Sequence, residues 1–164
     1  MQHPSLLHRA AVFIVVVVGI VGTVATSKAQ PKITWRPVGA SDVDVSPHLR
    51  ASGGLDCDDY QCRGLTLRVD NTGDDLLVID WEQTRYLYND GDAGTFVVDD
   101  AAPAKPTTIL PHSSLSVALT PRAVMRDDVS RAPLDLGNSG IALVARHGDV
   151  VERVTLRFEV IAAR

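Results

Sequence analysis

The sequence lacks the features that mark helical and repetitive proteins. Beyond residue 29, no segment keeps a 3.6-residue apolar periodicity for more than about two turns. The chain also contains no internal repeat and no low-complexity tract. These absences disfavour a helical fold and a repeat architecture, and they leave the fold class to be inferred from strand patterns.

Cysteine is scarce, because the chain has only Cys57 and Cys62. In an oxidising compartment such a pair predicts a disulfide, which closes a short loop and contributes about 2 kcal/mol in the chain-entropy model. A redox-active pair is disfavoured, because the spacing is not Cys-x-x-Cys and three neighbouring aspartates oppose a thiolate. No further thiol or imidazole lies close in sequence, so neither a metal nor another cofactor is expected.

The longest apolar run, residues 10–25, is N-terminal, carries no charge and follows a weakly basic start. Small residues come next, with Ser27 and Ala29 in the −3 and −1 positions of a signal-peptide cleavage site. We expect residues 1–29 to be a hydrophobic helix that acts as a signal peptide. The alternative is an uncleaved membrane anchor, although about 16 residues is short for the ~20 of a spanning helix. Either way, the remainder is expected in the periplasm or cell envelope, and in the anchor alternative it is anchored in the inner membrane.

Removal of residues 1–29 leaves 135 residues with 14 basic and 20 acidic side chains, a net charge of −6. This length suits one domain that buries its own core. The acidity argues against nucleic acid and against anionic membrane surfaces as partners, so a membrane contact is expected only through an uncleaved N-terminal segment.

Residues 30–63 are rich in Ser, Gly, Asp and Pro, and we expect an irregular N-terminal segment. It holds a first strand at residues 32–36, a short one near residues 43–45, the Gly53-Gly54 pair and the Cys57–Cys62 loop. Residues 64–164 are expected to form a β-sandwich core.

Strand patterns become clear after residue 64. Apolar and polar residues alternate strictly over residues 65–70, which predicts a half-buried strand. Residues 71–74, Asn-Thr-Gly-Asp, predict a turn, because Asn and Gly are able to take positive φ. Residues 76–81 are nearly all apolar and predict a central strand. The Asp90-Gly91 pair predicts a hairpin between residues 86–88 and 95–98. Further strands are expected at residues 107–110, 115–119, 141–146 and 150–161, with one helical turn or a loop near residues 124–129.

Seven to nine such strands indicate a single antiparallel β-sandwich. Residues 65–81 resemble immunoglobulin-like β-sandwich modules of bacterial exported proteins, which often carry a strand ending in Val-x-Asn-Thr-Gly before a strand that opens with Leu-x-Ile. Residues 108–115 look like the turn that precedes a later strand in these families. Uncharacterised envelope lipoproteins look similar over residues 65–121, but this chain lacks their lipid-attachment cysteine. The resemblance implies a fold and no reaction.

Candidate chemistry is sparse. The histidines beyond the signal segment, His48, His112 and His147, fall in expected turns, where a solvated role is the default. The run His112-Ser113-Ser114 suggests a hydrolase, but neither serine lies in a Gly-x-Ser-x-Gly elbow. Paired aspartates recur and suit calcium in principle, but no twelve-residue calcium loop is present, and solvated turns explain them.

Two tyrosines provide the best candidate surface. Tyr86 and Tyr88 face the same way along a strand that leads to a hairpin tip with Asp90 and Asp92, so these four residues are a candidate partner-binding site. The alternative is packing on one sheet face. We therefore expect an extracytoplasmic protein-binding or structural accessory module, not an enzyme, whose partner is another envelope or extracellular protein. The alternative is a small secreted hydrolase or metal-dependent enzyme that uses His112 and nearby carboxylates.

Overall fold

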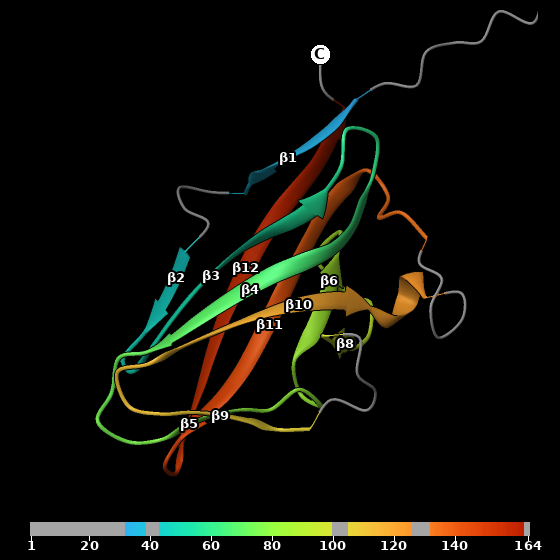
Figure 1. Ribbon diagram of the computed structural model, residues 1–164. Helices are drawn as coiled ribbons and strands as arrows, with labels where there is room; N and C mark the ends of the chain where they lie inside the picture. Colours follow the sequence, from blue (N-terminus) through green and yellow to red (C-terminus); the bar gives the residue numbers. More distant parts are fainter. Residues whose placement is uncertain (1–31, 39–42, 100–104, 126–131, 163–164) are drawn as a thin grey trace, which may run out of the picture.

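The computed structural model describes residues 32–38, 43–99, 105–125 and 132–162 as an all-β domain of two antiparallel sheets (Figure 1). Residues 1–29, which we expect to be a hydrophobic helix that acts as a signal peptide or an anchor, lie outside the described ranges. Within the described ranges, no helix has the length and apolar character needed to span a membrane.

The first sheet is built around the long β11–β12 hairpin, whose strands pair from Gly137↔Val160 to His147↔Val150. Its strand order is β1-β12-β11-β5-β9, with β6 paired to β11 and β7 paired to β6. The bounds are β1 (Ile33–Pro37), β5 (Leu77–Ile79), β6 (Arg85–Tyr88), β7 (Gly91–Asp92), β9 (Thr107–Ile109), β11 (Gly137–His147) and β12 (Val150–Ala162).

The second sheet has the order β2-β3-β4-β10-β8 and lies across the first in Figure 1. Its strands are β2 (Val43–Ser46), β3 (Leu49–Cys57), β4 (Cys62–Asn71), β8 (Phe96–Val98) and β10 (Ser114–Pro121). One 3-10 turn, η1 (Arg122–Val124), follows β10. Residues 124–129, for which the sequence left a helical turn or a loop open, lie outside the described residues from residue 126 onward.

One hydrophobic core joins the two sheets, and the period-two patterns of the sequence produce it. In β12 the residues Val154, Leu156, Phe158 and Val160 are buried, while their alternate neighbours face outward. The ring of Trp35 packs edge-on against Phe158, with centroids 5.4 Å apart. The alternation predicted for residues 65–70 is likewise confirmed by β4.

The expectation of an irregular segment is wrong for Leu49–Cys57, which form the nine-residue strand β3. The Gly53-Gly54 pair had suggested a loop. In the sheet, a Cβ on Gly53 would lie 2.5 Å from the Thr66 carbonyl oxygen, and one on Gly54 would lie 2.7 Å from Trp35 Cζ2. Glycine is therefore present because neighbouring groups approach the strand closely, not because the chain turns.

The predicted hairpin partner is also wrong. Strand β6 pairs with β7, with Tyr88 opposite Gly91, and the two turn residues are Asn89 and Asp90, with φ of 48° and 64°. Both central residues have positive φ, as a type I′ turn requires. The next strand, β8, pairs with β10 in the other sheet. Its three residues are all buried, which suits a strand that crosses to the second sheet.

Candidate functional site

Four chain connections meet at one end of the domain, at the lower left of Figure 1, and we call this region the hairpin end. Backbone hydrogen bonds join three of them: Thr72 N donates to His48 O at 2.9 Å, and Asn71 N, at the end of β4, donates to Ser113 O at 2.9 Å. The connections are residues 47–48 between β2 and β3, 72–76 between β4 and β5, 110–113 between β9 and β10, and 148–149 between β11 and β12.

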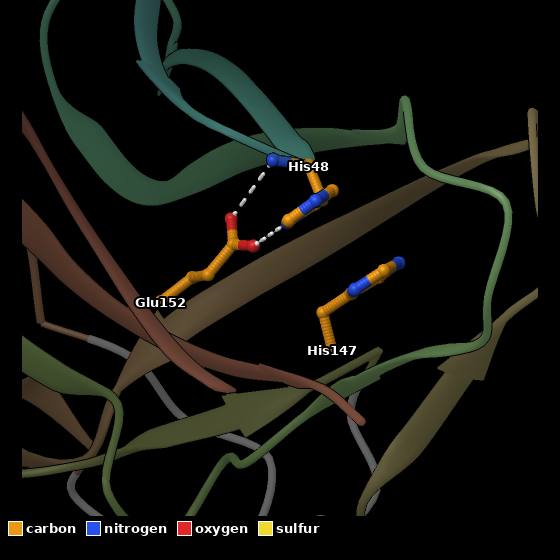
Figure 2. Close-up of side chains that lie close together, drawn as sticks. All are labelled: His48, His147 and Glu152. Carbon is orange, nitrogen blue, oxygen red and sulfur yellow. Dashed lines mark hydrogen bonds and ion pairs between the residues drawn. The ribbon is translucent and has the colours of Figure 1, made fainter. Parts of the chain in front are cut away.

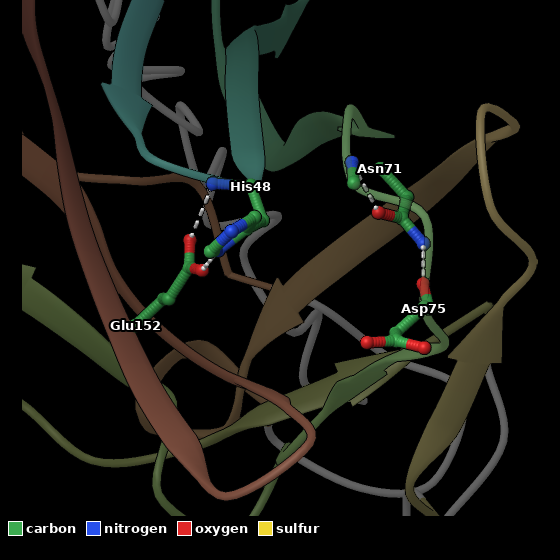
Figure 3. A network of polar contacts seen from close by, with 5 residues as sticks. His48, Asn71, Asp75 and Glu152 are labelled. Atoms are coloured by element: carbon green, nitrogen blue, oxygen red, sulfur yellow. Dashed lines mark hydrogen bonds and ion pairs between the residues drawn. The ribbon is translucent and has the colours of Figure 1, made fainter.

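Asn71 organises the hairpin end from the last position of β4 (Figure 3). Its side chain is almost fully buried. The amide Nδ2 lies 2.8 Å from Asp75 O and 3.1 Å from both Ile109 O and Leu110 O, and donates to these carbonyls. Its Oδ1 accepts from Gly73 N at 3.0 Å. One amide thus holds the β4–β5 connection against the end of β9.

His48 and Glu152 link the two sheets at this end (Figures 2 and 3). The side chain of Glu152 is 2% exposed and that of His48 is 39% exposed. His48 Nδ1 lies 2.7 Å from Glu152 Oε1, and the backbone N of His48 donates to Oε2 at 3.3 Å. An ionised carboxylate only accepts hydrogen bonds, so the tautomer of His48 that suits this contact is the one with the proton on Nδ1. Glu152 sits on the inward face of β12, two residues before the core residue Val154.

His147 completes the cluster (Figure 2). Its ring stacks on that of His48, with centroids 4.1 Å apart and planes inclined by 3°. The residue is buried, and His147 Nε2 has no hydrogen-bond partner in the part of the chain that the structure describes. An unpaired buried polar atom costs about 1–3 kcal/mol. A Cβ on Gly73 would overlap Nε2 and lie 3.1 Å from Cε1, so glycine is what lets the ring pack here.

Apolar side chains are exposed around this cluster. Strand β5 pairs with β9 with Leu77 opposite Ile109, which places Leu76 and Leu110 at the same end of the pair. The exposed residues, which we call the apolar end patch, are Leu76 (49%), Leu110 (63%), Val150 (54%) and Val151 (39%). Three exposed carboxylates flank them in the sequence, from Asp74, Asp75 and Asp149. The hairpin end therefore combines an apolar surface with an acidic border.

His112, the residue of the hydrolase alternative, also lies at the hairpin end. Its Nε2 is 2.9 Å from Asp74 Oδ1, but both side chains are well exposed. Ser113 Oγ donates to Leu110 O at 2.6 Å rather than to a histidine. A shallow depression of about 470 Å³ lies across β3, β4 and β10, and its lining contains no histidine. Among the described residues, the contact of His112 is therefore with a carboxylate, and the neighbouring serine hydroxyl bonds a backbone carbonyl instead.

Tyr86, the first residue of the predicted partner-binding site, lies in the core. It is 3% exposed, its OH lies 3.0 Å from Ser139 Oγ, and its ring packs edge-on against Phe96 at 5.9 Å. Burial raises the pKa of Tyr86 above its ordinary value. The burial of Tyr86 agrees with the alternative that this tyrosine packs on one sheet face, and its side chain is not available to a partner.

The other three predicted residues lie at or near the surface. Tyr88 is half-buried and its OH donates to Leu136 O at 3.2 Å. Asp90 lies 3.3 Å from the guanidinium of Arg157, and Asp92 lies 3.3 Å from that of Arg85. Partner binding by these three residues stays a prediction.

Cys57 and Cys62 lie within disulfide distance, with the two sulfurs 2.00 Å apart, at the turn between β3 and β4. The Asp58 carboxylate accepts hydrogen bonds from the backbone N of Tyr60 at 2.8 Å and of Gln61 at 2.9 Å. These bonds, led by that from Tyr60, hold the pKa of Asp58 below its usual value. This loop is a hairpin turn of the second sheet.

Sequence reasoning treated His48 and His147 as solvated and did not connect them with Glu152. His48 and Glu152 are 104 residues apart, so spacing along the chain carries no sign of the cluster. One signal was available in the sequence: in an alternating strand, Glu152 lies on the same inward-facing side as Val154 and Leu156. A carboxylate at a core position requires a buried partner.

Comparisons with known proteins give no family. No protein-family model matches the chain, and no curated protein sequence matches it. Among solved structures, one described as a protein from Archaeoglobus fulgidus is similar at 15% identity, with 74% of this chain and 98% of that chain covered. The TM-score of 0.29 is too low to support an argument about fold or function.

Proposed function

We propose that this chain is an exported, non-catalytic module with an immunoglobulin-like β-sandwich fold, and that it binds another envelope protein through the apolar end patch. The observation that carries this proposal is the exposure of Leu76, Leu110 and Val150, which the strand pairing places at one end of the first sheet, with exposed Val151 next along β12. Contiguous apolar surface bordered by polar residues is typical of protein-interaction sites. The exported location rests on the signal-like residues 1–29.

The chemistry of the patch defines the kind of partner. Asp74, Asp75 and Asp149 are all exposed and adjoin apolar residues of the patch along the sequence. A complementary partner presents apolar side chains flanked by Lys or Arg, because such an arrangement buries the leucines and meets the carboxylates with opposite charge. Binding of this kind weakens as salt rises, since the border charges are solvent-exposed.

Site-specific photocrosslinking in the native cell tests the proposal. A photoreactive amino acid at Leu110 is expected to give a discrete adduct with one other protein. The same group at Tyr60, an exposed residue of the Cys57–Cys62 loop, serves as the control and is expected to give none. Adding Leu76→Ser is expected to reduce the adduct, and raised salt in a lysate is expected to dissociate the complex. Equal adducts from both positions, or no adduct from Leu110, would overturn the proposal.

The exported location has its own test. The intact mass of the protein from its native source is expected to correspond to a chain that begins at Gln30. A mass that retains residues 1–29 would instead establish an anchored module beside the membrane. A full-length protein recovered in the cytoplasmic fraction would contradict export.

A further inference from the structure

We infer that His48, His147 and Glu152 bind a divalent transition-metal ion, with Zn²⁺ as the representative ion. Each residue offers one ligand atom, and these atoms lie within 4.8 Å of one another. A tetrahedral Zn²⁺ has bonds of about 2.0–2.2 Å, so its neighbouring ligand atoms stand about 3.3 Å apart. A rotation of one imidazole ring and a small shift of the side chains would therefore bring the three ligand atoms to coordination distance.

The donor set selects the kind of ion. Two imidazoles and one carboxylate suit Zn²⁺, Cu²⁺ or Ni²⁺, whereas Ca²⁺ and Mg²⁺ take shells made of oxygen ligands. Three protein ligands leave a fourth position for water or for a donor from a bound partner. The ion has an entry path, because the His48 side chain is 39% exposed.

Two buried groups of the cluster lack a full set of polar partners, although His147 Nε2 itself lies against Gly73. His147 Nε2 lies in the interior without a hydrogen bond from any described residue. Glu152 is a buried carboxyl group whose hydrogen-bond partners among the described residues are the half-exposed imidazole and the backbone N of His48. Unsatisfied buried polar atoms in native proteins commonly mark an ion or a water. A divalent cation beside these residues would neutralise Glu152 and use imidazole lone pairs.

Coordination requires one change in the cluster. The stacked rings are nearly parallel, at 3°, so the lone pairs of their nitrogens lie in parallel planes and do not meet at one point. His147 is held over Gly73, whereas His48 projects from the β2–β3 turn and its side chain is 39% exposed, so the proposed change is a rotation of the His48 ring. The metal then replaces the proton between His48 Nδ1 and Glu152, and that proton leaves to solvent.

A bound ion would also join the two sheets. His48 belongs to the turn between two strands of the second sheet, while His147 and Glu152 flank the β11–β12 turn of the first. Metal binding to the folded chain alone raises its stability by mass action. Zinc in large excess over its Kd is expected to raise Tm by about 5–10 °C for a chain of this size.

Isothermal titration calorimetry of the full chain, prepared without a polyhistidine tag, tests the site. Zn²⁺ is expected to bind one high-affinity site with micromolar Kd or tighter, and Ca²⁺ and Mg²⁺ are expected to give no saturable binding. His48→Ala is expected to weaken Zn²⁺ binding about 100-fold or more and to abolish the Tm increase. His112→Ala removes an exposed histidine from the same end and is the matched control, with binding unchanged.

A measurement on the unaltered protein keeps the test decisive if His48→Ala does not fold. In histidine-ring NMR spectra, one equivalent of Zn²⁺ is expected to shift the signals of His48 and His147 and to leave that of His112 in place. Equal Zn²⁺ affinity in the protein and in His48→Ala would overturn the inference. So would the absence of saturable binding, or a first equivalent that shifts only His112 or the N-terminal histidines.

Discussion

Replacement of Asn71 by alanine is the sharpest test of the hairpin end. The substitution removes the side-chain partner of four backbone groups: Gly73 N and the carbonyls of Asp75, Ile109 and Leu110. The bonds to Gly73 and Ile109 are buried, and the other two are partly accessible to water. A buried group left unpaired costs about 1–3 kcal/mol, so the expected loss in the free energy of unfolding is about 3–5 kcal/mol.

Urea denaturation followed by tryptophan fluorescence measures this loss, because Trp81 is buried in the native protein. With a typical urea m-value, the midpoint for Asn71→Ala is expected to fall by about 2 M or more without a change in m. Thr72→Ala, at an exposed position of the same turn, is the control and is expected to stay within about 0.5 kcal/mol of the parent. A loss below about 1 kcal/mol for Asn71→Ala, or equal losses for both, would refute the assigned role.

Two further predictions concern packing and pH. Gly73→Ala is expected to lower the free energy of unfolding by about 1–3 kcal/mol, because the new methyl group overlaps the ring of His147. Gly91→Ala, whose Cβ would lie 3.4 Å from its nearest neighbour, is expected to cost less in the same urea titration, and a reversed order would contradict the packing argument. Burial raises the pKa of Tyr86, so the free energy of unfolding that depends on its neutral phenol is fully present below pH ~10 and is lost as pH rises further. In urea titrations at several pH values, Tyr86→Phe is expected to reduce this alkaline loss in the free energy of unfolding, whereas Tyr60→Phe, at an exposed position, is not. The same dependence of stability on pH in both variants would exclude Tyr86 as the source of the loss.

The fold was largely predictable because alternation reports which residues face the core. Strands β4 and β12 were predicted from their period of two, and both are confirmed with the expected inward residues. Strand β3 was missed because its Gly53-Gly54 pair has the composition of a loop. Only the close approach of Thr66 and Trp35, which is a property of the assembled sheets, explains glycine at those positions.

The candidate site was less predictable because it depends on contacts between sheets. His48, His147 and Glu152 come from a turn of one sheet and a hairpin of the other, and no local motif connects them. The Tyr86 prediction shows the reverse problem. The sequence shows to which side of the strand Tyr86 points. It does not show that Phe96, in a strand of the second sheet, packs against that side and buries the ring.

The Asn-Thr-Gly segment at residues 71–73 gains a different meaning from the structure. The sequence predicted a turn at residues 71–74, where Asn and Gly are able to take positive φ. The β4–β5 connection does begin at residue 72, but neither Asn71 nor Gly73 is among the described residues with positive φ. Asn71 is needed for its amide, which satisfies buried backbone groups of two connections. Gly73 is needed because His147 occupies the space of its absent Cβ. The segment thus sets the position of the His147 ring against His48, so a substitution at Gly73 is expected to disturb Zn²⁺ binding although residue 73 supplies no ligand.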